Sequence, residues 1–130
     1  MRKEIIKTPG AWVSPSPISQ ATRFGQLVFT SGQGPVDPKT GKIAQGGFEA
    51  EIRQALENLS AVLKAAGTSF GNVLKCTVFL ADMNNFDVYN EVWKEYFPDN
   101  RPARSAIQAA RMPRGFSIEI EAIACIPDKD

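Results

Sequence analysis

Residues 48–80 read FEAEIRQALENLSAVLKAAGTSFGNVLKCTVFL, and this stretch decides the fold class of the chain. Between residues 48 and 66 the apolar side chains recur every three or four positions, which predicts an amphipathic helix with one buried stripe. Gly67 stands where the cap at the end of such a helix is expected. Residues 73–80 are rich in β-branched and apolar side chains, which predicts a central strand. A long helix followed directly by a buried strand indicates an α/β (α+β) protein.

Turn residues and apolar patterning predict the remaining elements. They are a short strand at 5–7, a hairpin of strands 20–24 and 27–33, a second helix from 82–84 to 97, a strand at 103–110 and a last strand at 116–126. A turn at Pro113-Arg114 would pair the last two strands as neighbours. This order predicts one domain, residues 1–130, with a mixed six-stranded sheet and both long helices on one face. An aromatic stripe on the second helix is interpreted as core.

The other face of this sheet is also predicted to be apolar. The strand at 73–80 has apolar side chains on both sides, and Ile123 and Cys125 lie on the opposite side of the last strand from Ile118 and Ile120. If the helices cover only one face, the second face exposes more apolar area than a monomer normally tolerates. We therefore expect the chain to self-associate.

The composition restricts the partners that the chain can have. The 130 residues include 15 basic and 14 acidic side chains, so the net charge of +1 creates no field that attracts nucleic acid. No stretch approaches the ~20 apolar residues of a membrane helix, and no signal peptide is apparent, which predicts a cytoplasmic protein. Cys76 and Cys125 lie far apart in apolar segments and are interpreted as free thiols.

The chain contains no histidine. This absence excludes Ser-His-Asp and Cys-His catalysis, a histidine-pair ribonuclease mechanism and any histidine metal ligand. Chemistry must therefore depend on other polar side chains, backbone groups and water.

Arg104 is the first candidate functional residue, because an arginine at the start of an apolar strand is costly to bury unless an anion meets it. Its planar fork matches the two oxygens of a carboxylate ligand, although an ion pair within the protein or a solvated strand end would also explain it. If the last two strands pair, Glu121 becomes a diagonal neighbour of Arg104 on the same face. A slip of one residue would separate them onto opposite faces. Ser31 and Gly32 end a strand with backbone groups that a ligand could approach closely, a weaker signal.

Four motifs together resemble the YjgF/RidA family. They are Thr30-Ser-Gly-Gln33, Lys75-Cys-Thr-Val-Phe-Leu80, Arg101-Pro-Ala-Arg-Ser105 and Ile118-Glu-Ile-Glu-Ala-Ile-Ala124. The resemblance covers about residues 18–126. It implies a chorismate-mutase-like fold, assembled as a trimer with a barrel-like core and three clefts between subunits.

The resemblance also implies an activity, the hydrolysis of 2-imino acids such as 2-iminobutanoate and 2-iminopropanoate to 2-oxo acids and ammonia. In this scheme Arg104 holds the substrate carboxylate and Glu121 orients or activates water. Ser31 and Gly32 line the cleft, and Asn90 contributes a polar contact. The scheme requires neither a metal nor an organic cofactor.

Two positions depart from the family pattern. Ile18 stands where the family commonly has a tyrosine in the cleft, and Ala106 stands where many members have a cysteine. The change at Ile18 predicts an altered preference for the substrate side chain or a different reaction. A regulatory protein that binds a small carboxylate without turnover is therefore the alternative function. An endoribonuclease or translation inhibitor is a third reading, which the missing histidines and the near-neutral charge disfavour.

Overall fold

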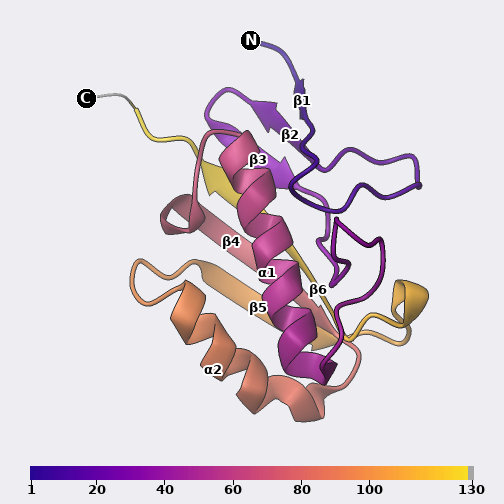
Figure 1. Cartoon of the computed structure of the whole chain (residues 1–130). Helices are drawn as coiled ribbons and strands as arrows, with labels where there is room; N and C mark the ends of the chain where they lie inside the picture. Colours follow the sequence, from indigo (N-terminus) through magenta and orange to yellow (C-terminus); the bar gives the residue numbers. More distant parts are fainter. Residues whose placement is uncertain (129–130) are drawn as a thin grey trace.

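The computed structural model describes residues 1–128 and contains one six-stranded sheet with the strand order β1-β2-β3-β6-β4-β5. Figure 1 shows the sheet with its two long helices. The elements are β1 (Glu4–Ile6), β2 (Ala21–Phe24), β3 (Leu27–Thr30), α1 (Gly47–Ala65), β4 (Val73–Leu80), α2 (Phe86–Tyr96), β5 (Ala103–Gln108) and β6 (Ile118–Cys125), with short 3₁₀ turns at Phe70–Asn72, Met83–Asn85 and Pro113–Gly115. The predicted α+β class and the mixed six-stranded sheet are therefore confirmed.

The pairing of the last two strands differs from the prediction. β5 pairs with β4 in parallel, whereas β6 lies between β3 and β4 and is antiparallel to both. The predicted hairpin around Pro113 is therefore wrong. A parallel pair needs a long crossover connection, and α2 supplies it between β4 and β5. β5 consequently forms one edge of the sheet, and β6 lies in the middle.

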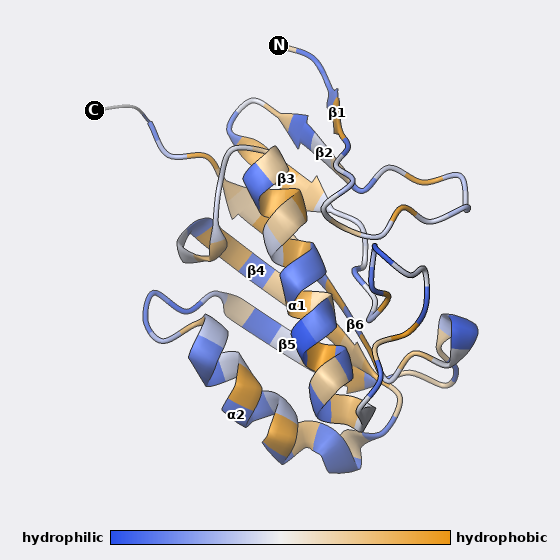
Figure 2. Cartoon of the chain, viewed as in Figure 1, coloured by the Kyte–Doolittle hydropathy of each residue, from blue (hydrophilic) through white to orange (hydrophobic). Residues whose placement is uncertain are grey.

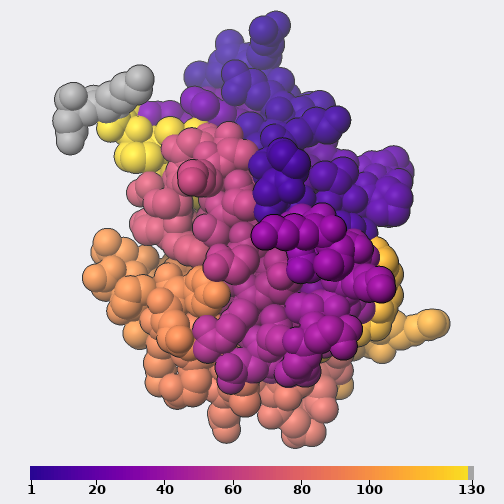
Figure 3. All heavy atoms as spheres, viewed as in Figure 1, coloured from indigo at the N-terminus to yellow at the C-terminus, as the bar shows by residue number. Residues whose placement is uncertain are grey.

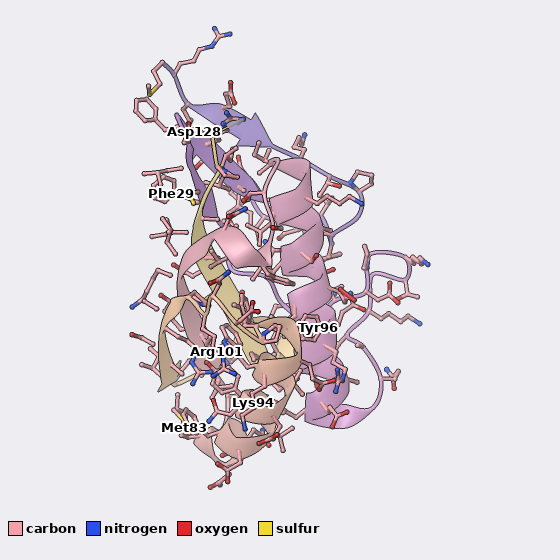
Figure 4. All side chains as sticks on the ribbon, turned by 90° about the vertical axis from the view of Figure 1, so that its left-hand side faces the viewer. Phe29, Met83, Lys94, Tyr96, Arg101 and Asp128 are labelled. Carbon is pink, nitrogen blue, oxygen red and sulfur yellow. The ribbon has the colours of Figure 1, made fainter. Side chains whose placement is uncertain are left out.

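Both helices cover the same face of the sheet, as predicted (Figures 1 and 4). Cys76, Val78 and Leu80 of β4 and alternate residues of β6 point to this face and are buried. α1 contributes the largest set of fully buried aliphatic side chains to the same core. In the space-filling view of Figure 3 the atoms of α1 and α2 form one continuous surface over this face.

α1 follows directly from its sequence. Its hydrophilic and hydrophobic residues alternate along the turns (Figure 2), and the apolar stripe packs on the sheet. The helix ends at Ala65, with Ala66 as the C-cap, and Gly67 adopts a φ of +90°, which a residue with a side chain rarely accepts. The prediction of this helix and of its glycine stop is confirmed.

The opposite face of the sheet remains uncovered in the single chain. Large apolar side chains are exposed there, among them Phe29 at 42%, Ile107 at 51% and Ile123 at 36%, and Figure 4 shows Phe29 on the side away from α1. Leu74, which regular strand alternation would place on the same face as Cys76, is 48% exposed because the register shifts between Val73 and Lys75. An irregularity of this kind redirects a side chain to the other face.

Both cysteines are free, as predicted. Burial raises the pKa of the Cys76 thiol to about 12, which makes it unreactive at neutral pH. Within residues 1–128, no helix combines the length and the apolar character that crossing a bilayer requires.

Candidate functional site

A cleft of about 600 Å³ opens between the N-terminal loop and the ends of β3 and β6. The N-terminal loop contributes Trp12 and Ile18, the chain after β3 contributes Ser31 and Gly32, and β6 contributes Glu119. This size is within the range of ~300–1,000 Å³ that is usual for small-molecule sites. The cleft therefore brings together three residues predicted as ligand contacts, namely Ile18, Ser31 and Gly32.

Glu119 forms the acidic floor of this cleft. A Cβ atom added to Gly32 would lie 2.7 Å from the carboxyl carbon of Glu119, so the absence of a side chain at Gly32 makes room for the acid. The Glu119 side chain is partly buried, and among residues 1–128 no hydrogen-bond or ion-pair partner to its carboxylate is found. A carboxylate in such a position is available to a ligand or to water.

Burial raises the pKa of Glu119 above its ordinary value, and the nearby charge of Glu121 raises it further. A carboxyl group whose pKa is shifted toward neutrality is a better proton acceptor than an ordinary surface glutamate. Its place in the cleft and its raised pKa make Glu119 the candidate acid–base group of the cleft.

Hydrogen bonds hold the walls of the cleft in place. The hydroxyl of Ser31 donates to the carbonyl oxygen of Ser19 at 2.6 Å, and the backbone N–H of Ser31 donates to the carbonyl oxygen of Gln20 at 2.9 Å. The backbone N–H of Gln33 donates to the carbonyl oxygen of Ile120 at 2.7 Å, which joins the chain after β3 to β6 beside Glu119. The cleft is therefore preformed by the sheet and by its adjoining loops.

Arg104 lies outside this cleft, on the helical face of the edge strand β5. Its Nη2 donates to Oδ1 of Asn90 at 2.8 Å. The guanidinium carbon lies 4.5 Å from the ring centre of Tyr89 and 5.2 Å from that of Trp93. These contacts are cation–π interactions, which orient the guanidinium without neutralising its charge. The aromatic stripe of α2, predicted as core, is core and also forms this cradle.

The predicted proximity of Arg104 and Glu121 is wrong. Arg104 pairs with Cys76, which pairs with Ala122, so Arg104 points to the helical face. Glu121 pairs with Thr77 and points to the uncovered face. The cause is the misassigned neighbour of β5, because one residue of difference in register exchanges the two faces of a strand.

Sequence reasoning missed Glu119, Trp12, Phe116 and Arg114, all of which line the cleft. Glu119 had a signal, since it interrupts the same apolar run as Glu121 and shares its side of β6. The other three had none. Trp12 lies in a loop and Arg114 in a turn, where no periodicity indicates a site, and Phe116 is only one more apolar residue of the predicted last strand. Asn90 does not line the cleft but accepts the hydrogen bond of Arg104.

The sheet, the helices on one face and the acid-floored cleft define an α+β protein with a candidate small-ligand site. The family model described as endoribonuclease L-PSP matches residues 11–126, and the chain belongs to this family, also known as YjgF/RidA.

Named relatives agree with this assignment. A RutC family protein of Pyrococcus horikoshii is 49% identical, and the match covers 94% of this chain and 97% of the relative. The 2-iminobutanoate/2-iminopropanoate deaminase of Mus musculus is 48% identical over 94% of this chain and 90% of its own length. The crystal structure of Escherichia coli TdcF with bound serine superposes with a TM-score of 0.89 at 43% identity and covers 94% of this chain and 98% of that one.

Proposed function

We propose that this protein hydrolyses 2-imino acids, including 2-iminobutanoate and 2-iminopropanoate, to 2-oxo acids and ammonia. The observation that carries the proposal is the Glu119 carboxylate, which lies against Gly32 on the floor of a preformed cleft. The deaminase name of the mouse relative supports the same chemistry. No histidine is needed, because a protonated imine is already electrophilic.

Glu119 is the general base in this proposal. It accepts a proton from water as the water oxygen bonds to the imine carbon. Glu119 then passes this proton to the nitrogen of the tetrahedral intermediate. As the carbon–nitrogen bond breaks and ammonia leaves, the Glu119 carboxylate accepts the proton of the hydroxyl group and the carbonyl forms. A raised pKa suits a group that must both accept and return a proton. The sequence assigned this role to Glu121; the orientation of that residue toward the uncovered face favours Glu119 instead.

Arg104 binds the substrate carboxylate in this proposal, and it does so from a second copy of the chain. Within one chain Arg104 and Glu119 point to opposite faces of the sheet, so one subunit cannot offer both to a small substrate. β5 is an edge strand, which places Arg104 where a neighbouring copy can approach. A closed ring of copies, such as the trimer implied by the sequence resemblance, would complete one site at each interface.

A coupled assay tests this proposal. Imines are generated in situ by an amino-acid oxidase, and the release of 2-oxo acid is compared for wild type, Arg104→Ala and Glu119→Gln. We expect wild type to accelerate hydrolysis and each variant to lose at least ~100-fold. No acceleration by a folded wild-type assembly would contradict the proposed function.

Mixing the two inactive variants tests whether the site is shared between copies. If Arg104 and Glu119 come from different subunits, co-refolded Arg104→Ala and Glu119→Gln chains should recover activity, at about a quarter of the sites by random pairing. If both groups act within one chain, every site in the mixture lacks one of them and no activity returns.

A binding function without turnover is the second candidate. The observation that favours it is the serine bound in the TdcF structure, since a relative can hold a small carboxylate that is not an imine. Binding of serine or a 2-oxo acid to the wild type, measured calorimetrically, without acceleration of any imine, would favour this candidate. A cytoplasmic location and the absence of a nucleic-acid partner stay predictions of the sequence.

A further inference from the structure

The cleft extends well beyond Glu119, and its far part is apolar and aromatic. The buried ring of Phe116 covers Gly34, where an added Cβ would lie 2.5 Å from the ring. Trp12 packs edge-on against Phe116, with the ring centres 6.5 Å apart. Ile18, which also lines the cleft, is 58% exposed in the single chain. We call Trp12, Ile18 and Phe116 the apolar wall.

The apolar wall is held rigidly rather than by a loose loop. The buried side chain of Gln20 donates to the carbonyl oxygens of Thr8, Ala11 and Trp12 and accepts from the backbone N–H of Thr8 at 2.7 Å. These bonds fasten the N-terminal loop onto the start of β2. A wall fixed in this way discriminates between ligands by shape, because it does not collapse onto a small one.

The size of the cleft exceeds the needs of the shortest substrates. In the single chain the cleft measures about 600 Å³, and a three- or four-carbon imino acid together with the Arg104 side chain of a second copy would fill only part of it. If such a substrate placed its reacting carbon at Glu119, the apolar wall would contact water. A larger apolar side chain would displace that water and bury its own surface against the wall, which is favourable.

We propose that the apolar wall is a side-chain subsite that makes this enzyme prefer 2-imino acids with bulky apolar side chains, aromatic or branched aliphatic, over those with short ones. The inference rests on the proposed function for the identity of the reacting group. It adds the substrate class, and it assigns Trp12, Ile18 and Phe116 as the residues that determine specificity.

The charges around the cleft distinguish this substrate class from an acidic one. Arg114 lies on the tryptophan, with its guanidinium carbon 4.8 Å from the ring centre of Trp12, and is exposed to solvent. Lys7 also lines the cleft. The guanidinium of Arg114 stacks on the ring of Trp12. The substrate side chain would therefore contact the apolar wall and not a buried cation.

The test compares imines made from alanine, 2-aminobutyrate, leucine and phenylalanine by an amino-acid oxidase with catalase present. We expect kcat/KM for the leucine or phenylalanine imine to exceed that for 2-iminopropanoate by roughly tenfold or more, the range that added methylene groups produce in an apolar pocket. Ile18→Trp fills the subsite at an exposed position, so this ratio should fall at least ~tenfold in that variant. Val88→Trp on α2 adds the same ring at another partly exposed position and should leave the ratio unchanged. Equal rates, or faster hydrolysis of the short imines, would overturn the subsite while leaving the proposed function intact.

A binding measurement separates the subsite from the reaction. Calorimetry with pyruvate, phenylpyruvate and 2-oxoglutarate needs no turnover. Tighter binding of phenylpyruvate than of pyruvate, lost in Ile18→Trp, would support the subsite even if no imine were hydrolysed, in which case only the proposed function fails. Tightest binding of 2-oxoglutarate would overturn the apolar assignment in favour of Arg114 and Lys7.

Discussion

At the scale of single residues, two glutamates on one strand differ because of what surrounds them. Glu119 and Glu121 both point to the uncovered side of β6, two positions apart. Glu119 is half-buried against Gly32 in the cleft, whereas Glu121 is exposed. The different burial of the two carboxylates therefore arises from the neighbours of each side chain and not from the motif that contains both.

Glutamine substitutions should separate the roles of these two residues. Glu119→Gln is expected to lower kcat/KM at least ~100-fold, because an amide cannot accept the proton. Glu121→Gln should retain activity, but the acidic limb of its pH–rate profile should move to lower pH, since the charge of Glu121 raises the pKa of Glu119. The profiles of wild type and both variants check this. Loss of activity in Glu121→Gln alone would restore that residue as the base.

The same pKa shift affects stability. A carboxyl group whose pKa is raised by folding favours the folded state fully below its unfolded pKa, and this contribution is lost as the pH rises through the folded pKa. Glu119 therefore costs stability at neutral pH. We expect Glu119→Gln to be more stable than wild type at pH 7 in urea unfolding, with the gain shrinking as the pH falls to about 4. A gain that does not depend on pH would contradict this origin.

Tyr89 presents a second prediction at the residue scale. Its side chain is fully buried, and its hydroxyl finds no hydrogen-bond partner among the described residues. Burial also raises the pKa of the phenol. Tyr89→Phe removes this hydroxyl and keeps the ring beside Arg104, so stability should be unchanged or rise by up to ~1 kcal/mol. Tyr89→Leu also removes the ring face and should weaken carboxylate binding. A loss above ~1 kcal/mol in Tyr89→Phe would mean that the assembled protein supplies a partner.

At the scale of elements, α1 both builds the core and positions one side of the cleft. Asn58 is a buried polar residue on this otherwise apolar helical face. Its Nδ2 donates to the carbonyl oxygens of Gly34 at 3.0 Å and Val36 at 2.8 Å. The chain after β3, which includes the cleft residues Ser31 and Gly32, is thereby tied to the helix.

Removing the hydrogen bonds that Asn58 donates should lower the stability of the fold. Asn58→Ala leaves two buried carbonyl groups without this donor, and we expect the free energy of unfolding to fall by roughly 2–4 kcal/mol. Gln54→Ala is the matched control, because Gln54 donates to the other end of the Asn58 amide at 3.1 Å and lies nearer the surface. The control should lose less than about 1 kcal/mol. Equal losses in urea unfolding would show that Asn58 acts only through its packing.

At the scale of the whole molecule, the uncovered sheet face implies an assembly. A row of exposed apolar side chains on β3, β5 and β6 is unusual for a monomer. The same face carries Lys75, which donates to Ser105 at 3.1 Å, and the exposed Glu121. A neighbouring copy would bury the apolar row and could meet these charged groups.

A charge placed on this face should prevent association. We expect the wild type to associate and Phe29→Asp to be monomeric at micromolar concentration, since burying an unpaired carboxylate is strongly unfavourable. Val88→Asp is the control, because Val88 is exposed to nearly the same extent, 41% against 42%, but lies on α2. Sedimentation velocity distinguishes the species. If wild type itself sedimented as a monomer, the shared site would be contradicted as well.

The sequence by itself determined the elements of this protein and its family. The helix at 48–66, its glycine stop, the β2–β3 hairpin and the strand at 73–80 were predictable because apolar periodicity and turn residues act locally. Arg104, Ser31, Gly32 and Ile18 were found as candidates because unusual residue types or a motif marked them.

The tertiary structure alone decided which strands are neighbours. The α2 crossover places β5 beside β4, and this non-local pairing sends Arg104 and Glu121 to opposite faces. It also decided that Glu119 and not Glu121 lies on the floor of the cleft, and that a loop tryptophan forms its wall. Local patterns carry no information on such pairings, because a strand has the same periodicity whichever neighbour it has, while one step of register exchanges its two faces.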